Sequence, residues 1–407
     1  MKILYIHQYF KTPQEGGAIR SYYLSKGLVE HGFEVEMITT HNAKVYRKTV
    51  VDGVTVHYLP VRYANSMGFL SRLLAFLRFV TKAKKLARKI NDVDLAYVTS
   101  TPLTVGFIAL WLKKKKNIPF IFEVRDLWPT APIEMGAIKG RPLKKWLYGL
   151  EAKIYREADK IVSLSPGMRD WIKGVVPEKD VYMIPNMADC QFFNNEIKDP
   201  KLVEFYHAKN PFVITYLGSI GPTNKLEYFL DIAESCLKQK INIQFKIVGH
   251  GGRLSHIKLS SYLKKLSNVE FIPHQNKEGV RAILNVSDAT YVCFANMPIL
   301  ATNSPNKLFD SLASGKLTIV NTPGWTKDLV EKYKCGFYAD PLNPQDFVNK
   351  ITPFLERRDL LETHKKNARS IAEEHYSKKM QIQKLVSVLN NEKQIKVSGS
   401  EVYILTA

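Results

Sequence analysis

The chain has 407 residues with 45% hydrophobic and 24% charged side chains, a composition that excludes a disordered chain and indicates a globular protein. Its length exceeds that of one typical core and predicts two domains of roughly 150 to 200 residues each. The 59 Lys and Arg against 38 Asp and Glu give a net charge of +21, which favours an anionic partner: nucleic acid, a membrane face or a phosphorylated substrate. Charge alone does not choose among these, and a basic surface that only aids solubility is the alternative.

The cysteines and the apolar runs indicate the compartment. Four cysteines are widely spaced without a C-x-x-C pair, so the sequence predicts neither a zinc site nor a disulfide framework and favours a reducing cytoplasm. The chain opens directly on a strand-like run, from which we expect no secretory signal. No apolar run approaches the roughly 20 residues of a membrane-spanning helix.

Short apolar runs alternate with helical patterns through the first half of the chain. The strand-like runs are residues 3–6, 35–38, 95–98, 120–124, 160–163 and 181–184. This alternation predicts right-handed βαβ units and a parallel, doubly wound sheet. Residues 54–58, after the turn signal Asp52-Gly53, are expected to be an antiparallel or edge addition.

A second series of the same kind follows a polar stretch near residues 194–211. Its strand-like runs are residues 213–217, 245–248, 269–272, 289–292, 317–320 and 336–338. The sequence therefore predicts an α/β protein with Rossmann-like domains at 1–192 and 193–375, and a C-terminal helix and tail at 376–407. Open parallel sheets bind ligands beyond the carboxyl ends of their strands, so the two halves are expected to face a central cleft.

Glycines mark three of the predicted strand ends. A glycine lets the backbone approach a phosphate or sugar closely, and a following helix N-terminus supplies amide donors. Lys225, just beyond the second of these loops, would add a compensating charge. The first glycine pair alone could be an ordinary strand-to-helix turn and lacks the G-x-G-x-x-G spacing of a nicotinamide site, whereas three glycine-marked strand ends together favour a ligand site. The candidate residues are Gly16 and Gly17, then Gly218, Ser219 and Gly221, then Gly249 and Gly251.

Three charged residues lie at the end of the strand-like run at 120–124. Glu123, Arg125 and Asp126 would lie at the carboxyl edge of the sheet, where catalytic groups of this architecture are found. Asp126 could orient or deprotonate an acceptor hydroxyl. The alternative is a Glu/Arg/Asp network that only holds the following loop.

The stretch NSPNKLFDSLASGK at 303–316 predicts a helix with an anion site at its start. Asn303 and Ser304 are N-cap residue types, Pro305 suits the first turn, and the amides of residues 306–308 would be free to bind an anion. Asp310, one turn further, suits the two hydroxyls of a ribose, since a carboxylate accepts a hydrogen bond from each. A surface Asp near a helix start is the alternative.

These motifs, in this order, resemble the retaining GT-B glycosyltransferases of family four. Within it, the chain is most similar to bacterial transferases of O-antigen and capsule assembly, including N-acetylfucosamine transferases. The resemblance covers nearly the whole chain and rests on these fragments: Gly16-Gly17, residues 123–128, 163–167, 184–189, the Gly218 loop, 248–251, and 304–310 with 313–315.

The resemblance implies a transfer from a UDP-sugar without a bound metal or other cofactor. The first domain would bind the acceptor, a polyprenyl diphosphate-linked saccharide, and the second the nucleotide sugar. Asp126 and Lys225 would be the catalytic residues. The donor would be bound by Gly16, Gly17, Gly218, Ser219, Gly249, Gly251, Thr302, Ser304, Pro305, Asn306, Lys307 and Asp310. Family members have two glutamates eight positions apart; here Asp310 replaces the second and Thr302 the first.

Residues 66–90 predict an amphipathic helix with a basic face. Phe69, Leu70, Leu73, Leu74, Leu77 and Val80 share one side, and Arg72, Arg78, Lys82, Lys85 and Lys89 another. This profile is typical of an interfacial helix and predicts peripheral contact with the inner face of the cytoplasmic membrane. A buried helix with a basic outer face would look similar.

Two other functions compete with the transferase. A UDP-sugar 2-epimerase has the same architecture, but would be expected to place acid/base carboxylates around the sugar, where this chain has Thr302. A non-catalytic nucleic-acid-binding protein would use the +21 charge, but leaves the glycine-marked strand ends without a purpose. We therefore expect no nucleic-acid partner.

Overall fold

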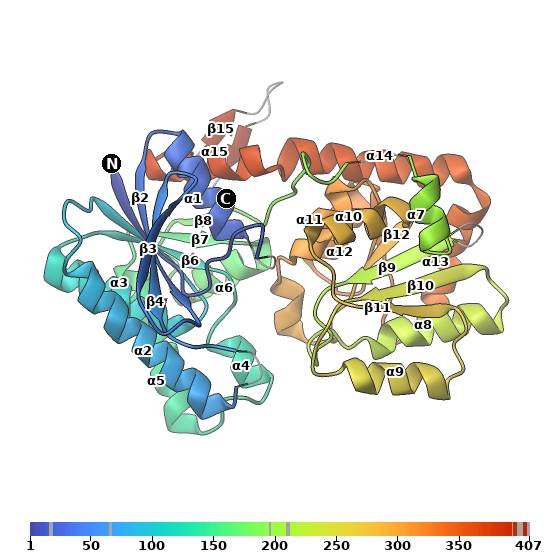
Figure 1. The fold of residues 1–407 in the computed structure, drawn as a ribbon, viewed down its shortest axis with the longest axis horizontal. Helices are drawn as coiled ribbons and strands as arrows, with labels where there is room; N and C mark the ends of the chain where they lie inside the picture. Colours follow the sequence, from blue (N-terminus) through green and yellow to red (C-terminus); the bar gives the residue numbers. More distant parts are fainter. Residues whose placement is uncertain are drawn as a thin grey trace. The chain divides into compact units, whose positions relative to one another are not determined.

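The computed structural model of the protein describes residues 1–15, 19–64, 67–194, 197–208, 212–392, 394–396 and 402–404. The chain forms two compact units, one of Met1–Pro185 with Gln381–Ala407 and one of Asn186–Met380. Figure 1 shows each unit as a sheet flanked by helices.

The first unit has an eight-stranded sheet in the order β3-β4-β2-β1-β5-β6-β7-β8. All neighbouring strands are parallel except β3 and β4. Its central strands are almost entirely buried because helices cover both faces, which explains their continuous apolar runs. The strands are β1 (Lys2–Ile6), β2 (Glu34–His41), β3 (Arg47–Val51), β4 (Val54–Pro60), β5 (Leu95–Thr99), β6 (Phe120–Val124), β7 (Lys160–Ser163) and β8 (Val181–Met183).

Of the two alternatives predicted for residues 54–58, the hairpin at Asp52-Gly53 bears out the antiparallel pairing and not the edge position. β4 pairs in parallel with β2 and antiparallel with β3. The edge strand of the sheet is therefore β3, and β4 is the second strand. Sequence pattern missed β3 because three of its five residues are Arg47, Lys48 and Thr49, and its side chains are partly or fully exposed. A charged, exposed edge strand protects the sheet from pairing with other chains.

The helices of the first unit begin where the sequence offers start signals. At α6, Ser165 is the N-cap and its Oγ accepts the N–H of Met168 at 3.1 Å, with Pro166 in the first turn. α3 packs against α2 and against α5. The helices are α1 (Arg20–Glu30), α2 (Phe69–Ala87), α3 (Gly106–Lys116), α4 (Thr130–Glu134), α5 (Arg141–Glu157) and α6 (Pro166–Val175), with a short 3-10 helix η1 (Leu103–Val105).

The second unit has a six-stranded, fully parallel sheet in the order β11-β10-β9-β12-β13-β14. The strand order reverses between β9 and β12, the type of position where open α/β sheets bind ligands. The strands are β9 (Phe212–Leu217), β10 (Ile243–Val248), β11 (Val269–Ile272), β12 (Ala289–Val292), β13 (Leu317–Val320) and β14 (Gly336–Tyr338).

Helices flank this second sheet, with apolar cores on both sides. They are α7 (Pro200–Phe205), α8 (Glu227–Lys238), α9 (Leu254–Leu263), α10 (Lys277–Val286), η2 (Pro298–Thr302), α11 (Asn306–Ala313), α12 (Trp325–Lys332), α13 (Pro344–Glu356) and α14 (Arg358–His375).

The C-terminal segment begins with α15 (Lys378–Leu389), whose residues from Gln381 onward belong to the first unit. There Ile382 fills the space over Gly27, and Lys160 Nζ donates to the carbonyl of Val388. The expected tail instead contains an antiparallel pair of strands, β15 (Gln394–Lys396) and β16 (Val402–Ile404). In the part of the chain that the structure describes, no helix has the length and hydrophobicity needed to cross a membrane.

Candidate functional site

The loops after β9 and β10 form one edge of the candidate site in the second unit. Gly218 and Gly249 have φ angles of +135° and +150°, which favour glycine. A Cβ at Gly249 would lie 1.9 Å from the Gly218 carbonyl oxygen, and one at Gly251 would lie 2.2 Å from that of Ile220. The glycines of the second loop therefore allow the two backbones to touch, while Gly218 and Ser219 remain exposed.

Helix α11 begins at Asn306, with Pro305 as its N-cap and no side-chain cap. The predicted capping role of Asn303 and Ser304 is therefore wrong. Ser304 is buried, and both of its oxygens are bound by Asn186 instead. Its Oγ accepts the backbone N–H of Asn186 at 3.2 Å, and its carbonyl accepts the Asn186 side-chain amide at 2.5 Å.

The start of α11 leaves donors available. The Leu308 N–H donates to the Pro305 carbonyl at 3.1 Å, so the prediction that it is free is wrong. Among the described residues, the N–H groups of Asn306 and Lys307 have no backbone acceptor. These two amides, at the positive end of the helix dipole, can bind an anion.

The Lys307 side chain joins α11 to the Gly218 loop. Its Nζ lies 3.0 Å from Tyr216 Oη and 4.1 Å from the centre of that ring, while Tyr216 Oη donates to the Ser219 carbonyl at 2.6 Å. A Cβ at Gly218 would lie 3.1 Å from the same Nζ. Burial lowers the pKa of Lys307 to about 8, and no carboxylate lies within ion-pair distance of it among the described residues.

Asp310 lies one turn into α11 with a partly exposed side chain. Burial raises its pKa to about 7; the charge of Lys277 opposes the shift and that of Asp189 adds to it. Asp189 itself binds Nζ of Lys277 and of Lys378, each at 2.6 Å. Within the described chain, the Asp310 carboxylate has no hydrogen-bond partner. It is therefore able to accept hydrogen bonds from ligand hydroxyls.

Thr302 ends the 3-10 helix η2, and its Oγ1 donates to the Ile299 carbonyl at 2.8 Å. The Asn303 carbonyl accepts the indole N–H of Trp325 at 2.7 Å. Both residues thus hold the loop that leads into α11.

Lys225 has different neighbours from Lys307. Its side chain is exposed, its backbone φ is +40°, and its Nζ lies 5.5 Å from the centre of the Tyr228 ring. The lysine that contacts the Gly218 loop is Lys307, which was predicted from the sequence only to bind the donor. A catalytic role for Lys225 stays a prediction.

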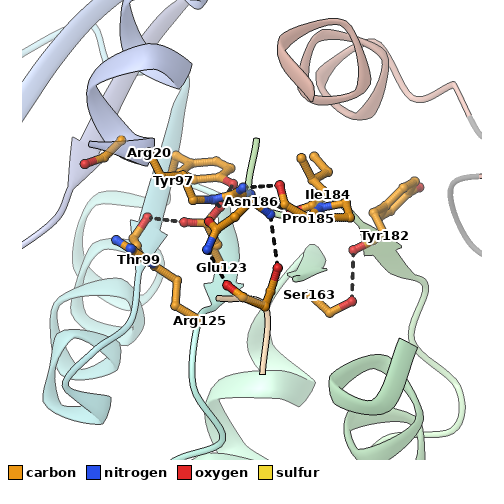
Figure 2. Close-up of polar contacts among 12 residues, drawn as sticks. Arg20, Tyr97, Thr99, Glu123, Arg125, Ser163, Tyr182, Ile184, Pro185 and Asn186 are labelled. Atoms are coloured by element: carbon orange, nitrogen blue, oxygen red, sulfur yellow. Dashed lines mark hydrogen bonds and ion pairs between the residues drawn. The ribbon is translucent and has the colours of Figure 1, made fainter. Parts of the chain in front are cut away.

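In the first unit, Glu123 is the centre of a buried network that spacing did not reveal (Figure 2). Arg20, the first residue of α1, donates to Glu123 Oε1 from Nε at 2.9 Å and from Nη2 at 2.8 Å. Tyr97 and Thr99 donate to the same carboxylate at 2.8 and 3.1 Å. Burial acts to raise the pKa of Glu123, but the charges of Arg20 and Arg125, with the hydrogen bonds from Arg20 and Tyr97, hold it below its usual value.

Arg20 also secures the end of the first unit. Its guanidinium donates to the carbonyls of Ile184, at 2.8 Å, and Pro185, at 2.5 Å. Glu123 is thus a structural residue paired with Arg20. The alternative of a network of Glu123 with Arg125 and Asp126 is therefore wrong, because the arginine that binds Glu123 is Arg20. Asp126 is exposed just beyond β6, where it could reach a ligand.

The glycine pair Gly16 and Gly17 lies outside the described residues. Among those that are described, no group of three or more His, Cys, Asp or Glu is placed to hold a metal ion. Independence from metal stays a prediction.

Comparison with protein families identifies both units. Residues 15–187 match the model described as glycosyl transferase 4-like domain, and residues 199–371 match that described as glycosyl transferases group 1. The chain belongs to the GT-B glycosyltransferases of family four. The predicted family and the predicted fold class, two Rossmann-like parallel-sheet units, are both confirmed.

Individual proteins are also similar to this family-four chain, one of them in sequence and two in fold. WcaI of Escherichia coli (strain K12), named as a glycosyl transferase of colanic acid biosynthesis, is 23% identical over 287 residues, 68% of this chain and 69% of that protein. Sucrose-phosphate synthase from Thermosynechococcus elongatus has a TM-score of 0.78 at 15% identity, covering 96% of this chain and 98% of its own. HepE of Anabaena, in complex with UDP-glucose, has a TM-score of 0.68 at 16% identity, covering 96% and 100%.

Proposed function

We propose that this glycosyltransferase moves a sugar, an N-acetylated or 6-deoxy hexosamine, from a UDP-sugar to a lipid-linked saccharide in surface polysaccharide biosynthesis. The observation that carries the proposal is the grouping at α11. Among the described residues, the Lys307 ammonium lies at the Gly218 loop without a carboxylate partner, and two N–H groups at the start of the helix have no backbone acceptor. Asp310 follows one turn on. The ammonium and the N–H groups suit a diphosphate, and the carboxylate of Asp310 suits the hydroxyls of a ribose.

The relatives support the choice of nucleotide and pathway. HepE binds UDP-glucose on a similar fold, and WcaI is named for the assembly of a polysaccharide. The transfer proceeds with retention and without a metal, and the leaving diphosphate is stabilised by the α11 amides and Lys307. Asp126 orients the acceptor hydroxyl.

Binding of nucleotides tests the donor site. We expect UDP at 100 times its Kd to stabilise the protein by about 2.7 kcal/mol, and GDP and a short DNA duplex to give smaller shifts in Tm. Asp310→Ala should weaken UDP binding about a hundredfold, because two hydrogen bonds to a carboxylate are lost. Asp328→Ala, which changes an exposed carboxylate on α12, is the matched control. Tight duplex binding that Asp310→Ala leaves untouched would overturn the proposal.

Helix α2 supports a membrane-bound acceptor. Leu70, Leu74 and Leu77 are 72%, 52% and 44% exposed, whereas Ala75 and Phe79 form the buried side. The apolar stripe read from the sequence is therefore largely solvent-facing, although its member Val80 is buried. Exposed leucines beside the exposed cations Arg78, Lys82 and Lys85 suit an anionic lipid surface.

Vesicle binding tests this contact. Leu70→Ser with Leu74→Ser should lower partitioning onto vesicles of anionic phospholipid by more than about tenfold, since each leucine is worth up to roughly 1.5–3 kcal/mol when fully buried. Leu259→Ser with Leu263→Ser removes an exposed apolar pair from α9 and is the matched control. If the α2 variant partitions like the wild type, α2 does not dock on the membrane.

A further inference from the structure

Arg125 is partly exposed, and within the described part of the chain its guanidinium forms no ion pair. It directly follows β6, at the carboxyl edge of the first unit's sheet. Glu123, two residues earlier, is bound by Arg20, and across the described residues no Asp or Glu forms an ion pair with Arg125. A guanidinium has five donors in a planar fork, which matches the oxygens of a phosphate or carboxylate.

His7 holds this guanidinium in place. Nη1 of Arg125 lies 3.1 Å from His7 Nε2, and His7 Nδ1 lies 2.7 Å from Ser21 Oγ. Because a guanidinium only donates, Nε2 must accept, so the ring is neutral and carries its proton on Nδ1. Burial, and then the charge of Arg125, hold the pKa of His7 well below its usual value. The imidazole therefore orients Arg125 without neutralising it.

Arg125 lies near a switch point of the strand order, the type of position where open α/β sheets bind ligands. Its backbone N–H donates to Ser100 Oγ at 3.1 Å, which joins the ends of β5 and β6. The strand order of this sheet reverses between β1, which His7 follows, and β5, which Ser100 follows. The adjacent Gln8 is fully buried, and in the described structure neither its amide oxygen nor its nitrogen has a partner.

A row of aromatic rings leads from His7 to α2. Ring centres are 6.4 Å apart for His7 and Tyr9, 4.8 Å for Tyr9 and Tyr63, and 5.9 Å for Tyr63 and Phe76. Phe76 and Trp128 continue the row at 6.5 Å. Tyr9, Tyr63, Phe76 and Trp128 are each partly exposed, so they offer an apolar surface to a sugar or a lipid.

We infer that Arg125 is the anion-binding residue of the first unit, and that its ligand is a phosphate or diphosphate ester whose organic part lies on the aromatic row. The inference rests on the proposed function in treating this ester as the acceptor. His7 is a positioning residue, which acts by orienting Arg125.

Direct binding without a sugar donor tests the inference. Geranyl diphosphate and inorganic pyrophosphate would each be titrated into the full chain by calorimetry. We expect geranyl diphosphate to bind more tightly than pyrophosphate, and Arg125→Gln to weaken both by about tenfold to a hundredfold, because charge-assisted hydrogen bonds are lost. Arg125→Lys should restore part of the affinity, and Arg156→Gln, an exposed arginine on α5, should change nothing.

Further variants separate this site from the donor site and from a folding defect. The Arg125-dependent signal should persist in Lys307→Met, which removes the cation of the second unit. His7→Gln, whose amide oxygen can still accept, should retain more affinity than His7→Phe at equal Tm. The inference is overturned if Arg125→Gln binds both diphosphates like the wild type, or if neither binds. Equal binding of pyrophosphate and geranyl diphosphate would exclude the aromatic row. Since no donor is present, these results stand apart from those with UDP and Asp310→Ala.

Discussion

Lys307→Met is expected to lower kcat by 10²- to 10³-fold, the size of effect seen when one preorganised donor to a developing negative charge is removed. The leaving diphosphate gains charge as the glycosidic bond breaks, and the Lys307 ammonium already lies at the Gly218 loop, bound to Tyr216 Oη at 3.0 Å. The protein should keep its Tm, because the side chain forms no ion pair in the described structure.

The pH dependence of UDP binding provides a second readout for the same residue. The pKa of Lys307 is lowered to about 8 in the free protein, so the cation is present below pH 8 and lost above it. If UDP binds only the charged form, its Kd should rise about tenfold at pH 9 relative to pH 7. Lys307→Met should bind UDP weakly and without this alkaline limb.

A matched variant guards against a general effect of losing a lysine. Lys327 also lies against a tyrosine ring in the second unit, with Nζ 5.0 Å from the centre of Tyr338. Lys327→Met should leave kcat and the pH profile unchanged. Equal losses in the two variants, or an unchanged kcat in Lys307→Met, would contradict the role of Lys307.

Glu123→Ala should destabilise the first unit by about 3–5 kcal/mol, because it leaves the buried Arg20 guanidinium without its counter-charge. Both side chains are almost completely buried, at 1% and 0% exposure. The change also removes the acceptor of Tyr97 and Thr99. Urea unfolding would measure the loss, with the transition of the first unit identified from hydrogen exchange in β5 and β6.

Two comparisons make this prediction specific. Asp170→Ala breaks an exposed pair with Arg169 in the same unit and should cost less than about 1 kcal/mol. The double change Arg20→Met with Glu123→Leu should cost less than the sum of the single changes Arg20→Met and Glu123→Leu, since neither charge is then left unpaired. A loss below 1 kcal/mol in Glu123→Ala would show that the pair does not stabilise the unit.

Much of the candidate site could be predicted from short sequence patterns. Glycines at the ends of β9 and β10, and the Ser-Pro-Asn-Lys stretch before α11, were recognisable because a turn or a helix start depends on a few consecutive residues. The same locality explains the small errors, such as the N-cap of α11, which is Pro305 rather than Ser304. A neighbour distant in the sequence, Asn186, binds Ser304 instead.

The sequence by itself determined most of the alternation of strands and helices and the two-unit α/β architecture, because apolar periodicity and turn residues act over short stretches; β3 and the strands of the tail were missed. The family was indicated by the resemblance of its motifs. Tertiary structure alone decided which charges meet. Glu123 pairs with Arg20, 103 residues away, and Lys307 rather than Lys225 contacts the Gly218 loop. Strand order and helix rotation bring these groups together, and neither is encoded in the spacing of the residues themselves.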